Sequence, residues 1–306
     1  MAVFYGTNGA DTLLGTPYDD DIYGFGGNDW LNGRSGDDWL FGGGGHDTLI
    51  GGTGINDFWG GSGHDRFVMS TRSSAGFSDD LIQDFTFDID RIDVSRWGVS
   101  DFSQIRALLY VDAAGDAALN AFYDGYDHVL RIGDVHPSQL IASDFIYSNS
   151  GSKNETGTAF DDVLFGSRFD DTLKGIAGDD VLLGGRGGDS LSGGAGWDLL
   201  NGGSGDDTLD GGSGNDRLRG GPGADTFLFD LAVLNNGTKE IDRILDYHRS
   251  QSDVIDLPDG AGSIASEAFV GGVWQLTLDG DGDVVKLLGV FDTDHDGHII
   301  DELLIA

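Results

Sequence analysis

The chain contains no cysteine, and it has only 17 lysines and arginines against 53 aspartates and glutamates. Without cysteine, neither disulfide bonds nor thiolate metal sites can form. The formal net charge of -36 disfavours nucleic acids and anionic membrane surfaces as partners, because both are polyanions, and it favours cations. Self-repulsion of this size also opposes a compact fold unless something neutralises the charge.

Several other signals are missing. No apolar run reaches the roughly 18 residues of a transmembrane segment, and Gly6 and Asp11 interrupt any N-terminal signal peptide. The sequence therefore predicts either a cytosolic chain or export by a route that needs no N-terminal signal. It has no His-Glu-x-x-His, Gly-x-Ser-x-Gly or Gly-x-x-x-x-Gly-Lys motif, and its repeats start at residue 6. We therefore expect no catalytic domain.

Glycine is abundant instead, with 53 residues, and it recurs with a period of nine. Fifteen nonapeptides (nonads) of the form Gly-x-x-Gly-x-Asp-x-apolar-x fill two blocks, 6–68 and 157–228. The first position is always Gly, the eighth is always Leu, Ile or Phe, and the sixth is Asp except at Asn56. The fourth position is Gly except at Tyr18, Phe160 and Phe169. A flexible glycine-rich linker would not keep an apolar residue at one position of every repeat.

Each nonad predicts a tight turn followed by a three-residue strand. Glycines at the first and fourth positions are expected to take positive φ, and the middle strand residue is expected to face a core. Two nonads then make one coil, so that the corners of nonads n and n+2 face each other across a shared ion. Carboxylate and carbonyl oxygens suit Ca²⁺. The predicted ligands are the sixth-position side chains Asp11, Asp20, Asp29, Asp38, Asp47, Asn56, Asp65, Asp162, Asp171, Asp180, Asp189, Asp198, Asp207, Asp216 and Asp225.

The segment "GGSGDDTLDGGSGNDRLRGGPGADTFLF" resembles the RTX, or haemolysin-type, calcium-binding nonapeptide repeat. The resemblance implies an all-β fold of parallel β-rolls that form when Ca²⁺ binds. It also implies a secreted, extracellular protein whose partner in export is a type I secretion apparatus. Counting facing corners gives about eleven ions, which would reduce the net charge from -36 to about -14.

A β-rich flank follows each block, and the two flanks resemble each other. "DLIQDFTFDIDRID" (80–93) corresponds to "DRILDYHRSQSDVID" (242–256), which predicts a tandem duplication. The predicted first unit is 1–150, with a β-roll at 6–68 and a flank at 69–148. The second is 151–306, with a β-roll at 157–228 and a flank with a C-terminal secretion signal at 229–306. The terminal "DELLIA" has the acid-then-apolar character of such a signal.

Two further groups of acids have more than one interpretation. Asp80, Asp84, Asp90 and Asp93 are candidates for catalytic carboxylates, for turn and cap residues, or for additional Ca²⁺ ligands. In the loop 292–303, Asp292, Asp294 and Asp296 match an EF-hand, but its twelfth position is Leu303 instead of Glu. This loop is a weaker calcium candidate, or it is an acidic turn.

Outward-facing aromatic residues form a row in the first block, with Tyr23, Phe41 and Trp59 at the ninth position and Trp39 at the seventh. The row predicts either a stacking platform for sugar rings or a surface that the flank covers, and we favour the covered surface. Two roles follow for the whole chain. One is a non-catalytic extracellular binding or matrix protein, with polysaccharide or cell-surface glycans as candidate ligands. The alternative is a polysaccharide-modifying RTX enzyme or its carbohydrate-binding accessory module.

Overall fold

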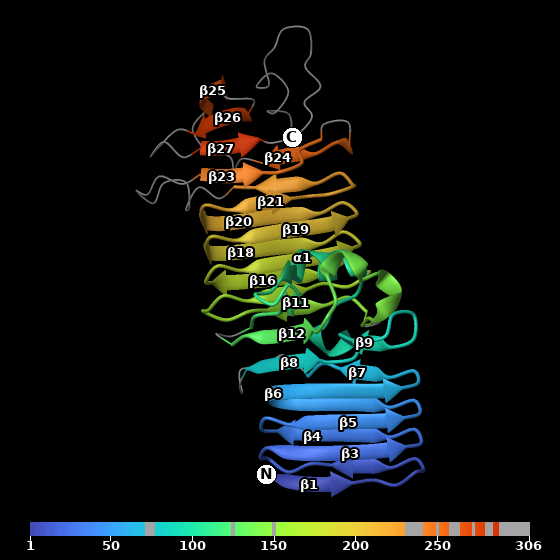
Figure 1. Cartoon of the computed structure of the whole chain (residues 1–306). Helices are drawn as coiled ribbons and strands as arrows, with labels where there is room; N and C mark the ends of the chain where they lie inside the picture. Colours follow the sequence, from blue (N-terminus) through green and yellow to red (C-terminus); the bar gives the residue numbers. More distant parts are fainter. Residues whose placement is uncertain are drawn as a thin grey trace. The chain divides into compact units, whose positions relative to one another are not determined.

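The structure is a computed structural model that describes residues 1–70, 77–123, 126–148, 151–229, 241–248, 251–256, 264–270, 273–278 and 284–287. The chain divides into two compact units, Met1–Asn149 (unit 1) and Ser150–Ala306 (unit 2). Each unit consists of short strands stacked as successive coils (Figure 1). None of the helices in the described ranges is long and apolar enough to cross a membrane.

The coil of unit 1 has two parallel faces that share one long strand. One face follows the order β1-β3-β5-β6, and the other joins β2, β4, β6 and β7. Asp21 pairs with Trp39 and Trp30 pairs with Thr48, so neighbouring strands are 18 residues, or two nonads, apart. This register confirms that nonads n and n+2 lie on top of each other. The strands are β1 Ala2–Tyr5, β2 Thr12–Leu14, β3 Asp20–Gly26, β4 Trp30–Ser35, β5 Trp39–Gly44, β6 Thr48–Ser62 and β7 Arg66–Val68.

The coil of unit 1 extends beyond the predicted limits of 6–68 at both ends. β1 adds a strand before Gly6, and the flank adds β8 in parallel to β6 and β9 in parallel to β7. β12 then pairs in parallel with β8, and β11 and β10 complete an antiparallel meander. The flank elements are β8 Ser78–Ile82, β9 Arg91–Asp93, η1 Ser95–Trp97, α1 Phe102–Leu108, β10 Leu109–Val111, β11 Ala117–Asn120, β12 His128–Ile132, η2 Pro137–Gln139, η3 Ala142–Asp144 and β13 Phe145–Ile146.

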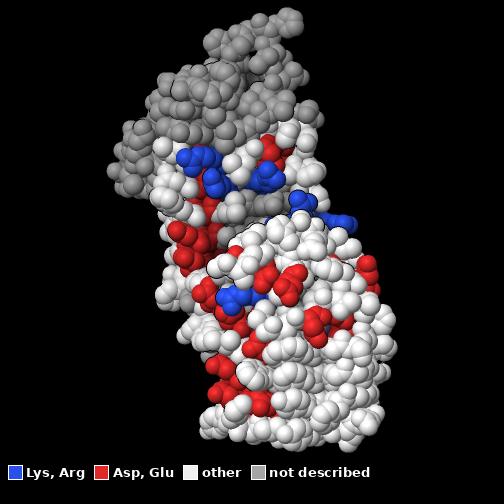
Figure 2. Space-filling model, in the orientation of Figure 1, with Lys and Arg blue, Asp and Glu red and all other residues white. Residues whose placement is uncertain are grey.

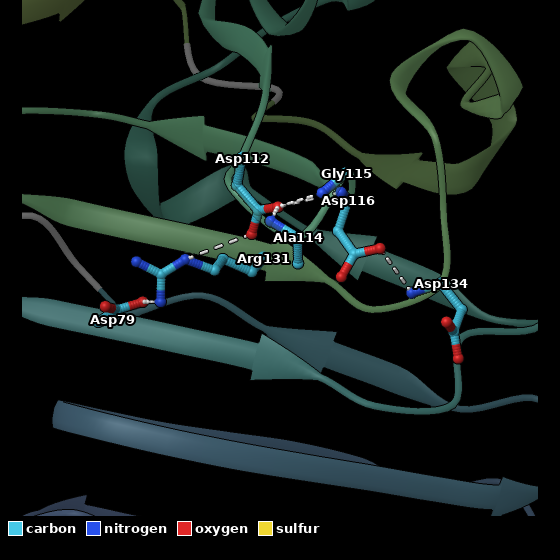
Figure 3. A network of polar contacts seen from close by, with 7 residues as sticks. All are labelled: Asp79, Asp112, Ala114, Gly115, Asp116, Arg131 and Asp134. Carbon is cyan, nitrogen blue, oxygen red and sulfur yellow. Dashed lines mark hydrogen bonds and ion pairs between the residues drawn. The ribbon is translucent and has the colours of Figure 1, made fainter.

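An arginine fastens this meander to the coil. The Arg131 guanidinium on β12 lies between Asp79 of β8, at 2.5 Å, and Asp112 of the β10–β11 turn, at 3.8 Å (Figure 3). The Asp112 carboxylate also accepts hydrogen bonds from the backbone N–H groups of Ala114, Gly115 and Asp116. These bonds, with that to Asp116 first, hold the pKa of Asp112 below its usual value. The acids of this turn thus serve the local structure.

Unit 2 has two parallel sheets, one on each face of its coil. The six-stranded sheet has the order β14-β16-β18-β20-β22-β24, and the eight-stranded sheet has the order β15-β17-β19-β21-β23-β27-β26-β25. β27 is parallel to β23, and β26 and β25 follow it in antiparallel pairs. The strands are β14 Asn154–Thr156, β15 Val163–Phe165, β16 Thr172–Ala177, β17 Val181–Arg186, β18 Ser190–Gly196, β19 Leu199–Ser204, β20 Thr208–Gly214, β21 Arg217–Arg219, β22 Thr226–Leu228, β23 Ile241–Ile244, β24 Val254–Asp256, β25 Ile264–Val270, β26 Val273–Leu278 and β27 Val284–Leu287.

The core of each coil is a column of eighth-position side chains, as the repeat predicts. All of these residues are buried except Leu13 in the first nonad, which is half-buried. Each fully buried Leu, Ile or Phe stabilises the fold by about 1.5–3 kcal/mol relative to an exposed side chain. Because one nonad contributes only one such residue, the coil depends on its corners for the rest of its stability.

The role predicted for the first-position glycines is wrong. Positive φ occurs instead at the second and fourth positions, for example at Gly43 (φ 106°) and Gly45 (φ 135°), and never at the first. A Cβ added to Gly15 would lie 2.6 Å from the Gly33 carbonyl oxygen and 2.8 Å from Oδ2 of Asp20. The first position is therefore Gly because corner oxygens approach its Cα too closely for any side chain.

Candidate calcium-binding corners

The sixth-position side chains form two columns in each unit, one at each edge of the coil. All fifteen predicted ligands lie in these columns. Every one of them is buried except Asp11, which is half-buried. The columns are Asp20, Asp38 and Asn56, then Asp11, Asp29, Asp47 and Asp65, in unit 1. In unit 2 they are Asp171, Asp189, Asp207 and Asp225, then Asp162, Asp180, Asp198 and Asp216.

One oxygen of most corner aspartates joins successive coils. The backbone N–H of Asp29 donates to Oδ1 of Asp47 at 2.8 Å, and the N–H of Asp189 donates to Oδ1 of Asp207 at 2.8 Å. The same bond recurs along all four columns, always from one coil to the carboxylate 18 residues later. The repeat motif gives no sign of this ladder, because it depends on the stacking register.

The second oxygen of most corner carboxylates has no hydrogen-bond partner and is buried. These Oδ2 atoms belong to Asp29, Asp38, Asp47, Asp65, Asp180, Asp189, Asp198, Asp207 and Asp225. Leaving a buried carboxylate oxygen unpaired is costly, and a cation bound at the corner would remove this cost. Carbonyl oxygens lie close by, because a Cβ added to Gly42 would touch both Oδ2 of Asp47 and the Gly60 carbonyl oxygen. The corners thus offer the hard oxygen donors that Ca²⁺ prefers.

We call the corners whose Oδ2 atom has no hydrogen-bond partner open corners. Their electrostatics favour a positive ion. Burial, opposed in part by the Oδ1 hydrogen bonds and reinforced by neighbouring carboxylates, raises the pKa of Asp180 and Asp189 to about 8. The same causes raise the pKa of Asp38, Asp198 and Asp207 to about 7. Without a cation, these groups would hold protons near neutral pH. A bound Ca²⁺ supplies the charge that lets them ionise.

The first two corners of each block are closed by hydroxyl residues. The N–H of Thr16 donates to Oδ2 of Asp20 at 2.6 Å, and its hydroxyl donates to the same oxygen at 2.9 Å. Thr7 and Thr158 bind Oδ2 of Asp11 and Asp162 in the same way. Ser167 donates its N–H to Oδ2 of Asp171 and its hydroxyl to Oδ1. Burial alone would raise the pKa of Asp20, but the hydrogen bonds from Thr16 and Ala2 lower it.

The closed corners also differ in backbone conformation. None of their second- or fourth-position residues has positive φ, whereas the open corners that follow have positive φ at both positions, as at Ile176 (93°) and Gly178 (112°). This explains why Tyr18, Phe160 and Phe169 replace glycine at the fourth position, since each lies in a closed corner. A hydroxyl at the second position is the sequence signal of a closed corner.

The flank acids extend the columns. The N–H of Asp65 donates to Asp90, and the N–H groups of Asp216 and Asp225 donate to Asp242 and Asp253. Asp80 pairs in register with Asn56. Asp80 and Asp90 therefore lie in line with the predicted Ca²⁺ ligands, and their role as additional ligands stays a prediction. Asp84 caps the backbone N–H groups of Gly60 and Gly61, and Asp93 binds the guanidinium of Arg66.

Asn56 joins two coils without a cation. Its Oδ1 accepts the N–H of Asp38 at 3.2 Å, and its Nδ2 donates to Oδ1 of Asp80 at 2.7 Å. Asn56 and Asp80 are both buried. The Asn56 amide therefore both donates and accepts a hydrogen bond. In the open corners, the corresponding Asp oxygen has no hydrogen-bond partner.

The weaker calcium candidate and the predicted secretion signal both lie outside the described part of the chain. Asp292, Asp294 and Asp296 lie outside the described residues, as does the terminal "DELLIA". Within the described ranges, no three His, Cys, Asp or Glu side chains gather into a metal-binding group. Any ion at a corner would therefore need the carbonyl oxygens as well as the carboxylates.

The aromatic row of unit 1 is a stacked ladder. Ring centroids of Tyr23 and Phe41 are 4.7 Å apart with an interplanar angle of 2°, and those of Phe41 and Trp59 are 4.5 Å apart at 14°. The rings thus turn their faces toward each other and their edges outward, which opposes stacking of a sugar on the ladder. The expectation that the flank covers this surface fails at Trp39, which is 47% exposed, whereas Tyr23, Phe41 and Trp59 are half-buried.

Comparison with known proteins agrees with the corner chemistry. The RTX calcium-binding nonapeptide repeat matches in four copies, at residues 5–40, 41–68, 156–191 and 192–227. The chain carries RTX calcium-binding repeats. These repeats bind Ca²⁺, and the two matched stretches cover both blocks of nonads.

Among solved structures, the chain is similar to the AlgE6R3 subunit of the Azotobacter vinelandii mannuronan C5-epimerase. The identity is 29%, over 47% of this chain and 82% of that one, with a TM-score of 0.24. It is also similar to the extracellular lipase LipA of Serratia marcescens. There the identity is 20%, over 97% of this chain and 40% of the lipase, with a TM-score of 0.16. No curated protein matches the chain.

Proposed function

We propose that this RTX β-roll protein is a secreted binding module that folds when it meets extracellular Ca²⁺ and has no catalytic activity of its own. The observation that carries the proposal is the set of nine buried corner Oδ2 atoms without a hydrogen-bond partner. Ions that bind only the folded form stabilise it by about 2.7 kcal/mol per site at a hundredfold excess over Kd. Summed over many corners, this term decides between the folded and unfolded chain.

Circular dichroism tests the calcium dependence. In EDTA the far-UV spectrum is expected to show a largely disordered chain, and millimolar Ca²⁺ is expected to produce the β signal. Mg²⁺ is the control ion and should substitute poorly, because it requires a tighter octahedral shell and releases water reluctantly. A chain that is fully folded in EDTA would contradict the proposal.

The ligands we propose are the sixth-position side chains with their neighbouring carbonyl oxygens. Asp80, Asp90, Asp242 and Asp253 add four stacked pairs to the columns. If every stacked pair held an ion, the number would rise from about eleven to about fifteen. Closed corners and the Asn56–Asp80 pair are expected to hold no ion, which lowers the number of bound ions. Calorimetric stoichiometry with the whole chain measures where the number lies.

The alternative is a polysaccharide-modifying enzyme that uses the flank carboxylates. Against it, Asp84, Asp90 and Asp93 are each committed to a hydrogen bond or ion pair that holds the coil together. Hydrogen bonds from Ser95 and Arg66 overcome the effect of burial and lower the pKa of Asp93. An assay of uronate polymers for epimerisation or cleavage separates the two roles, since activity lost in Asp84→Asn would favour the enzyme.

We further propose that the chain is a tandem duplication of one roll-plus-flank unit. The supporting observation is the order β8-β12-β11-β10 in unit 1 and β23-β27-β26-β25 in unit 2, each a parallel pair followed by an antiparallel meander. Asp84 and Asp246 also occupy equivalent places, because each caps the glycine N–H groups that follow the last full coil. Chains that contain only one unit are expected to bind Ca²⁺ separately.

A further inference from the structure

Unit 2 carries a row of basic residues on the eight-stranded sheet. Arg217 on β21 pairs in register with Arg243 on β23, and Arg243 pairs in register with Lys286 on β27. Neighbouring strands are about 4.8 Å apart, so these three positions are adjacent. In a chain with only 17 lysines and arginines, such a row is unexpected. Figure 2 shows several blue side chains close together in the upper half of the coloured surface, with red side chains beside them.

The two arginines of this row are not neutralised locally. Arg66 and Arg131 bind aspartates, and Arg219 lies 3.8 Å from Asp246. Within the described part of the chain, neither Arg217 nor Arg243 forms an ion pair. Like charges on neighbouring strands repel each other. An anionic ligand would remove this repulsion and gain charge-assisted hydrogen bonds.

A hollow of about 550 Å³ lies beside these arginines, and it contains an exposed tryptophan. Its lining consists of Asp179, Trp197, Asp198, Leu199, Asn215, Arg217, Ile241 and Arg243. Trp197 is 67% exposed, and in the described residues no other aromatic ring stacks on it. The indole thus keeps a face available, unlike the rings of the unit 1 ladder.

Hydrogen bonds between coils fix the rim of the hollow. The backbone N–H of Trp197 donates to Oδ1 of Asp179 at 2.8 Å, and the backbone N–H of Ile241 donates to Oδ1 of Asn215 at 2.9 Å. The Asp198 carboxylate accepts the N–H of Asp180 in its column. One oxygen of each lining acid thus has a backbone partner, and Oδ2 of Asp198 belongs to a proposed calcium corner. Trp197 and Arg217 are exposed, and Arg243 is half-buried.

We infer that Trp197, Arg217 and Arg243 form a binding site for an acidic saccharide, a chain of sugar rings that bears carboxylate or sulfate groups. A sugar ring would pack its C–H face on the indole, and the two guanidinium groups would bind the acid groups in bidentate fashion. The inference rests on the proposed binding function and names its surface and ligand class. A neutral sugar would leave the arginines unpaired, and a simple anion would leave the indole unused.

Isothermal titration calorimetry of the whole chain in saturating Ca²⁺ tests this site. The probes are tetragalacturonate, a sulfated chondroitin tetrasaccharide, maltotetraose and hexaglutamate. One or both acidic tetrasaccharides are expected to bind at least about tenfold more tightly than maltotetraose and hexaglutamate. The stronger of the two identifies the acid group. Equal binding of hexaglutamate, or no binding of either acidic tetrasaccharide, would overturn the inference.

Three variants locate the binding. Trp197→Ala and the double variant Arg217→Lys/Arg243→Lys, which keeps the charge but loses the planar fork, should each weaken binding about tenfold. Arg186→Ala changes another exposed arginine of unit 2 and should leave binding unchanged. Circular dichroism with Ca²⁺ verifies that each variant folds. A chain that folds with Ca²⁺ but does not bind overturns only this inference. One that binds through these residues yet folds in EDTA overturns only the proposed calcium switch.

Discussion

At the scale of the residue, the corner aspartate has two separate tasks. Oδ1 accepts a backbone hydrogen bond from the coil before it, and Oδ2 is either closed by a hydroxyl, as at Asp20, or left unpaired, as at Asp189. The nonapeptide motif treats these corners as equal, because it records the Asp and not its partner. The difference between them predicts which carboxylates Ca²⁺ requires.

Asp171 and Asp189 test this difference within one column of unit 2. Asp189→Asn removes an unpaired carboxylate oxygen and should lower the number or the affinity of bound ions. Asp171→Asn changes a carboxylate that Ser167 already binds, so calcium binding should stay close to that of the parent chain. The measurement is calorimetric titration with Ca²⁺. Equal losses in both variants would show that the hydroxyl does not close the corner.

Asn56 gives a second prediction at this scale. Asn56→Asp replaces the donor to Asp80 with a second buried carboxylate, which should destabilise the calcium-free unit 1 and create a new calcium requirement. With Ca²⁺, the variant should bind an additional ion and show a lower calcium midpoint for unit 1. The matched control is Asp216→Asn, at the equivalent level next to Asp242, which should raise the midpoint of unit 2. An unchanged calcium titration in both variants would exclude the sixth position as a ligand.

The raised pKa values of the open corners predict how pH affects the calcium-free fold. A carboxyl with a folded pKa of about 8, such as Asp180 or Asp189, binds its proton more tightly in the folded than in the unfolded state. Its contribution is present below pH 4 and is lost as pH rises toward about 8. In EDTA the β signal should therefore grow as pH falls from 8 to 5. A signal that shrinks over this range would contradict the raised values.

At the scale of the element, each coil is a weak unit that depends on its neighbours. The parallel strands and the buried eighth position were predictable, because a nine-residue period with an apolar residue at one fixed position fits few structures other than stacked coils. The Asn56–Asp80 bond and the outward edges of the ladder rings were not, because they depend on contacts between residues 18 or more positions apart that only the stacking register brings together. The hydroxyl closure by Thr16 is different, since Thr16 and Asp20 are four positions apart and the second-position hydroxyl is visible in the sequence.

The aromatic ladder stabilises the elements that it joins. Phe41→Ala removes two close ring contacts, to Tyr23 and Trp59, and should lower the free energy of unfolding by about 2 kcal/mol. Trp39→Ala, which loses only an edge contact with Trp59, should cost less than about 1 kcal/mol. Denaturant unfolding in saturating Ca²⁺ compares the two. A larger effect at Trp39 would contradict this view of the ladder.

At the scale of the whole molecule, the net charge of -36 opposes a compact fold until cations neutralise it. Folding is therefore expected where the chain meets extracellular Ca²⁺. RTX repeat proteins are typically secreted. Deleting the last few dozen residues should keep the protein inside a host that carries its type I exporter, because the predicted signal is C-terminal. Deleting the first few residues should leave export intact. Immunoblots of cells and medium measure the outcome, and normal export of the C-terminal deletion would exclude this route.

The Oδ1 ladder gives the molecule a direction. Each corner amide finds its acceptor in the coil that comes later in the sequence, as Asp29 does in Asp47 and Asp189 does in Asp207. A chain that leaves the cell with its C-terminal end first, as a C-terminal signal requires, would always have that acceptor outside before the amide that needs it. Every new coil would then dock on a finished one, and Ca²⁺ would lock it against sliding back. The direction of the hydrogen bonds in the columns would thus favour outward movement of the chain over its return.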